Sequence, residues 1–84
     1  MPVLVRRVFG EAEVAQSHNV SRGGVRFVSK SRYYVGDLVK VACPYNEGGP
    51  NIELEARVVS RREHRDGAEW TYGVSYLRPP SGRN

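Results

Sequence analysis

The chain has 84 residues, 39% of them hydrophobic and 26% charged, with a formal net charge of +4. This length fits one small domain, and this composition excludes a disordered chain. No apolar run reaches the length of a membrane-spanning helix, and the single cysteine, Cys43, excludes an internal disulfide. The first residues lack the layout of a secretory signal, so we expect a cytoplasmic protein.

In chain order, apolar residues recur at every second position in six segments, and this period is typical of β-strands. The predicted strands cover about residues 3–9, 12–19, 24–28, 38–43, 52–59 and 70–77. Gly10 turns the chain after the first strand, and Asp66-Gly67 is typical of a hairpin between the last two. The sequence therefore predicts an all-β fold, a small six-stranded antiparallel β-barrel.

The same alternation predicts which side chains are buried. The expected core comprises Val5, Val14, Phe27, Leu38, Val41, Leu54, Val58 and Val74. The clearest run places Ile52, Leu54, Ala56 and Val58 on one face of a strand. The aromatic residues of the last strand, Trp70, Tyr72 and Tyr76, are also typical of a core in so small a protein.

The predicted domain boundary lies near the C-terminus. Residues 1–78 are expected to form a single domain, because no internal repeat or second hydrophobic pattern occurs. Residues 79–84 contain Pro, Ser and Gly and are expected to be a flexible tail.

The most informative segment is Asn19-Val20-Ser21-Arg22-Gly23-Gly24, a polar turn between two predicted strands. Asn19 and Ser21 can donate or accept hydrogen bonds, and Arg22 offers a planar fork suited to phosphate. The two glycines let a ligand come close to the backbone. We therefore take Asn19, Ser21, Arg22, Gly23 and Gly24 as candidate ligand-binding residues.

The pattern Asn-x-Ser-x-x-Gly, at Asn19, Ser21 and Gly24, resembles a signature of PilZ domains, which are bacterial receptor domains for cyclic di-GMP. Segments matching the strands of the family follow, and the resemblance covers about residues 3–77. It implies a β-barrel that binds this nucleotide in bacterial signalling. By resemblance, Asn19 would contact a guanine edge, and Ser21 with the Gly23-Gly24 backbone would lie against base or phosphate.

The chain departs from the family pattern upstream of the motif. Members that bind the nucleotide usually carry Arg-x-x-x-Arg some twenty or more residues before the asparagine or aspartate. Here Arg6 is followed four residues later by Gly10, and Arg7 by Glu11. Two phosphates need more positive charge than Arg22 alone supplies, so we expect binding that is weakened or lost.

We expect no enzymatic activity. The sequence offers no paired carboxylates in an apolar setting, no nucleophile with a base, and no ligand-spaced His or Cys cluster. No catalytic residue, metal ligand or cofactor is therefore predicted.

Two other functions stay open. A PilZ-like barrel that has lost the nucleotide would bind another protein or a neighbouring domain. A basic barrel could instead bind nucleic acid, since arginine outnumbers lysine eleven to two and Phe27 and Trp70 could stack on bases. Arg61, Arg62, His64 and Arg65 form a basic hairpin end, which is either a solvated turn or a patch that binds a partner.

Overall fold

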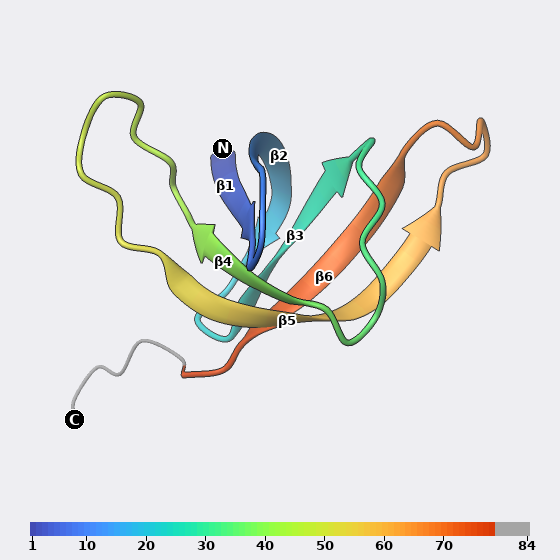
Figure 1. The fold of residues 1–84 in the computed structure, drawn as a ribbon. Coiled ribbons are helices and arrows are strands. Elements are labelled where there is room, and N and C mark those ends of the chain that lie inside the picture. Colours follow the sequence, from blue (N-terminus) through green and yellow to red (C-terminus); the bar gives the residue numbers. More distant parts are fainter. Residues whose placement is uncertain (79–84) are drawn as a thin grey trace.

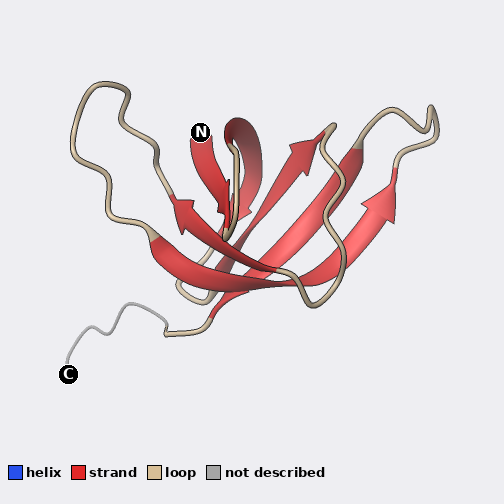
Figure 2. Ribbon diagram, in the orientation of Figure 1, coloured by secondary structure: helices blue, strands red, loops and turns tan. Residues whose placement is uncertain are grey.

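The computed structural model describes residues 1–78, and within them every regular element is a strand (Figure 2). The six strands are β1 (Pro2–Arg7), β2 (Ala12–Val20), β3 (Gly24–Ser29), β4 (Leu38–Ala42), β5 (Leu54–Glu63) and β6 (Trp70–Tyr76). They form a closed barrel in the order β1-β2-β3-β6-β5-β4, and all neighbours are antiparallel (Figure 1). The predicted six-stranded antiparallel barrel is confirmed.

Closure of the sheet suits a chain of this size, because it leaves no unpaired strand edge. The predicted tail, residues 79–84, lies outside the described residues, and the single-domain boundary at residue 78 stays a prediction. The predicted Asp66-Gly67 turn is present: Gly67 has a positive φ of 72°, and its N–H donates to the carbonyl of His64 at 2.9 Å.

Two β-bulges lie beside one cross-strand row of the barrel wall. The row joins Asn19 of β2, Arg26 of β3, Gly73 of β6 and Ser60 of β5. The register of β2 shifts between Ser17 and Asn19, and that of β5 shifts between Val58 and Ser60. A bulge bends its strand and redirects the next side chains, so the wall is curved where the motif begins.

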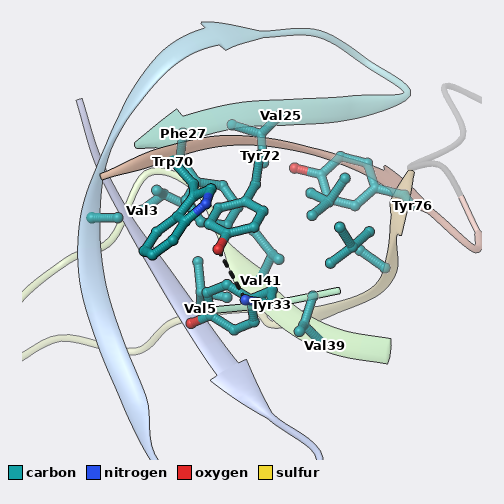
Figure 3. Packing of buried hydrophobic residues seen from close by; sticks show 14 residues of the cluster. Val3, Val5, Val25, Phe27, Tyr33, Val39, Val41, Trp70, Tyr72 and Tyr76 are labelled. Carbon is teal, nitrogen blue, oxygen red and sulfur yellow. Dashed lines mark hydrogen bonds between the residues drawn. The ribbon is translucent and has the colours of Figure 1, made fainter. Parts of the chain in front are cut away.

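The barrel interior holds an aromatic cluster (Figure 3). Phe27, Tyr33 and Tyr72 are each at most 1% exposed. The Tyr33 ring meets the Phe27 and Tyr72 rings edge-on, with centroids 6.1 and 5.1 Å apart. Trp70 and Tyr76 are buried beside them, which confirms the prediction for the aromatic residues of the last strand.

The hydroxyls of Tyr33 and Tyr72 have hydrogen-bond partners. The Tyr33 N–H donates to the Tyr72 hydroxyl at 2.9 Å, the contact dashed in Figure 3. The Tyr72 hydroxyl donates to the carbonyl of Ser31 at 2.6 Å, and the Tyr33 hydroxyl donates to Glu13 at 2.5 Å. Burial, and then the bond to Glu13, raise the pKa of Tyr33 far above its ordinary value.

The prediction for β2 was wrong about which face points inward. Val14 is 51% exposed, whereas its neighbour Ala15 is buried. Glu13 lies opposite Val5 in the register, and its carboxylate accepts bonds from the hydroxyls of Ser29 and Tyr33. These donors offset the desolvation of an inward-facing carboxylate, so the apolar Val14 is left on the outer face.

One further core prediction was wrong, and the strand predicted to begin at residue 52 begins at Leu54. Leu38 is 45% exposed, because it and the buried Val41 are an odd number of residues apart in one strand and face opposite sides. Ile52 is 83% exposed, because it precedes β5. Leu54 is partly buried against the core, and the other five predicted core residues, Val5, Phe27, Val41, Val58 and Val74, are buried.

Candidate functional site

The motif forms the tight connection between β2 and β3. The backbone N–H of Ser21 donates to the carbonyl of Gly24 at 2.9 Å, and the Ser21 hydroxyl donates to the same carbonyl at 3.2 Å. The carbonyl of Gly23 accepts the backbone N–H of Tyr76 at 2.9 Å. Hydrogen bonds therefore hold the loop both internally and against β6. They define its conformation in the absence of a ligand.

Gly24 is required by a close approach of two strands. A Cβ at this position would overlap the carbonyl oxygen of Val74 and lie 3.1 Å from the carbonyl carbon. Gly23 differs, because no atom lies within 4 Å of where its Cβ would be. Close strand packing thus explains why the last residue of the motif is glycine, and the sequence pattern alone does not reveal this.

An open groove of about 260 Å³ lies on the outer wall beside this loop. Four of the five predicted site residues line it: Asn19, Ser21, Gly23 and Gly24. Arg22 is exposed and is not among the lining residues. The groove continues over the paired strands, where its lining is Val25, Arg26, Val59, Ser60, Gly73 and Val74.

Gly73, which has no Cβ, is part of the lining of this groove. Gly73 lies between Arg26 of β3 and Ser60 of β5, and the Ser60 hydroxyl oxygen is only 2.5 Å from where a Gly73 Cβ would be. A larger residue at Gly73 would push Ser60 aside and raise the groove floor. The groove thus depends on β5 and β6 as well as on the motif.

A second hollow, also of about 260 Å³, adjoins the first. It is lined by Arg26, Ser60, Arg61, Arg62 and Thr71, so Arg26 and Ser60 belong to both hollows. Sequence alternation indicates that Arg26 points outward, between the buried Val25 and Phe27. Its alignment with Asn19 and Ser60 depends on strand pairing and on the two bulges, which the sequence does not reveal.

The basic hairpin end is partly used to hold the fold. Arg61 donates to the carbonyl of Tyr33 at 3.1 Å, and its guanidinium lies 5.0 Å from the centroid of the Tyr34 ring. The His64 ring nitrogen and the Thr71 hydroxyl are 2.6 Å apart. Arg61 and His64 therefore brace neighbouring segments, whereas Arg62 is exposed beside the second hollow.

Neither metal binding nor a membrane-spanning helix is indicated in the described part of the chain. Residues 1–78 hold no group of three or more His, Cys, Asp or Glu side chains that could bind a metal ion. No helix in this range has the length and apolar character needed to cross a membrane. The groove offers amide and hydroxyl groups, backbone and guanidinium groups, and these suit binding of a polar anion.

A protein-family comparison identifies the group to which this barrel belongs. The family model of the PilZ domain matches residues 1–84. The chain belongs to the PilZ family. No curated protein matches it in sequence.

Among known structures, this PilZ domain is similar to the inhibitor of motility MotI/DgrA of Bacillus subtilis, with a TM-score of 0.73 and 21% sequence identity. The similarity covers 96% of this chain and 40% of that one, so the chain spans less than half the length of its structural neighbour. At this level of identity, the likeness shows a common fold.

Proposed function

We propose that this PilZ domain is a receptor module that binds cyclic di-GMP in the groove beside Asn19. Membership of the PilZ family makes it a binding and signalling module in kind. The observation that carries the proposal is that four residues of the motif line one groove on the barrel wall. The motif loop is already fastened to β6, so binding would not have to order it, which favours affinity.

Each motif residue has a definite part in the proposed complex. Asn19 is exposed, and within residues 1–78 its side-chain amide makes no hydrogen bond to protein, so the amide is free to pair with a guanine edge. The Ser21 hydroxyl keeps lone pairs for a ligand while it donates to Gly24. The exposed backbone at Gly23 permits close approach, and Arg22 adds charge at the rim.

Titration calorimetry with cyclic di-GMP tests this function. The unsubstituted chain should bind, and Asn19→Ala should weaken binding about five- to a hundredfold, because the loss of one or two ligand hydrogen bonds costs roughly 1–3 kcal/mol. Asn46→Ala is the matched control, since Asn46 is also exposed but lines no part of the groove. An Asn19→Ala variant that binds as well as the control would show that the motif is only a turn.

A second function is favoured by exposed apolar side chains elsewhere on the barrel. Phe9 is 94% exposed, and Val8, Leu38 and Leu77 are each about half exposed and line one shallow depression. Such a surface suits contact with a protein partner or a neighbouring domain. If the folded chain does not bind cyclic di-GMP, a protein-interaction module remains, as the family also allows. If the chain does bind cyclic di-GMP, this apolar surface is a candidate for the contact through which binding affects a partner.

A further inference from the structure

We infer that Arg26 and Arg62 hold the phosphates of the ligand, and so supply from the barrel wall positive charge that two phosphates require beyond Arg22. This inference rests on the proposed function, because it assigns residues to the binding of cyclic di-GMP. It extends the site from the motif loop onto β3, β6 and β5.

Strand pairing places the two arginines on either side of β6. Arg26 lies opposite Gly73, and Arg62 lies opposite Thr71, two residues away on the same face of that strand. The strands that carry them are two strand spacings apart, roughly 10 Å. The residues between them, Gly73 and Thr71, are small, and both arginines line a common hollow.

The composition of the two hollows fits an anion. No carboxylate lines either of them among residues 1–78, and the charged residues present are Arg26, Arg61 and Arg62. Elsewhere on the barrel, depressions that contain arginine also contain glutamate: Glu11 and Glu13 accompany Arg7 in one, and Glu55 accompanies Arg6 and Arg7 in another. Among these four hollows of the described residues, the two beside the motif carry positive charge without a carboxylate.

Arg26 and Arg62, like Arg22, Arg57 and Arg65, have no protein partner within the described residues, in contrast to four other arginines. Arg6 is paired with Glu53 at 2.9 Å, Arg7 and Arg61 donate to backbone carbonyls, and Arg32 lies over the Trp70 ring. Within residues 1–78, neither Arg26 nor Arg62 makes a side-chain hydrogen bond or ion pair. Guanidinium groups that are not used by the fold can bind phosphate oxygens in a bidentate manner.

The test compares a double variant with a control of equal charge. In Arg26→Ala/Arg62→Ala, affinity for cyclic di-GMP should fall about a hundredfold or more, because each charge-assisted bond contributes roughly tenfold or more. Lys30→Ala/Lys40→Ala also removes two positive charges, from exposed positions outside both hollows, and should change affinity less than about threefold. The ³¹P resonance of the ligand should shift on binding to the unsubstituted chain and the control, and return toward its free position with the arginine variant.

The outcomes separate this inference from the function on which it rests. If Asn19→Ala weakens binding while the arginine variant behaves like the lysine control, the receptor function stands and the assignment of Arg26 and Arg62 is wrong. If the unsubstituted chain does not bind cyclic di-GMP, both are wrong. Arg26→Lys/Arg62→Lys should recover only part of the affinity, because lysine keeps the charge and loses the planar fork. Full recovery would show that a positive charge at these two positions suffices and would contradict bidentate contact by the guanidinium groups.

Discussion

The two faces of β3, β6 and β5 use their polar groups in opposite ways. On the inner face, Tyr33 and Tyr72 lie against Phe27, and both hydroxyls bond to protein groups. On the outer face, Arg26 of β3 and Asn19 of the neighbouring strand β2 line open hollows and have no side-chain hydrogen bond within the described residues. The inner polar groups thus stabilise the barrel, and the outer ones are available to a ligand.

This contrast follows from the period of a β-strand. Successive side chains alternate between faces, so Arg26 is placed outward by the same backbone that buries Val25 and Phe27. The strands that bury the aromatic rings also carry the groove residues. Packing of the core therefore holds the groove residues in place. A site built on paired strands is held more firmly than one built on a loop alone.

The largest expected effect comes from Gly24, where the motif meets the backbone of β6. Gly24→Ala should lower the free energy of unfolding by about 1–3 kcal/mol or more, because its Cβ overlaps the Val74 carbonyl and forces β3 and β6 apart. Gly23→Ala is the matched control and should stay within about 0.5 kcal/mol, since its Cβ meets no atom. Urea denaturation measures both, and equal stability of the two variants would show that β3 and β6 separate without cost.

A smaller effect, confined to the inner face, should appear at alkaline pH. The folded state raises the pKa of Tyr33 above the unfolded value of about 10, so the folded protein holds this proton more tightly. Stability should therefore be intact below about pH 10 and fall as the pH rises above it. Tyr33→Phe removes the titrating group and should make the decrease shallower in thermal unfolding measured from pH 8 to 11. An unchanged slope would contradict the hydroxyl network.

The sequence predicted the number of the strands and their order along the chain better than it predicted which face of each strand points into the core. Six strands and the Asp66-Gly67 turn follow from local patterns, because alternation and turn residues are local properties. The inward position of Glu13 is not a local property, because it depends on a hydrogen bond from Tyr33, which lies in the segment between β3 and β4. Alternation alone therefore put Val14 in the core.

The candidate site divides in the same way. The motif loop from Asn19 to Gly24 is contiguous in the sequence, so its residues could be named in advance, and the structure places four of them at one groove. The rest of the groove could not be named, because Ser60 and Gly73 come to Asn19 only through register and two bulges. The sequence identifies Arg62 only as part of a basic hairpin end, because its place in one hollow with Arg26 depends on strand pairing.

Binding of the ligand should involve the outer wall beside the motif and leave the inner face of the barrel unchanged. A ¹⁵N–¹H correlation spectrum of the chain titrated with cyclic di-GMP tests it most directly. The largest shifts should fall at Asn19, Arg26, Ser60 and Gly73, with small changes at Glu13 and Tyr33. Shifts concentrated around Phe9 or Tyr33 instead, or none at saturating nucleotide, would contradict the account.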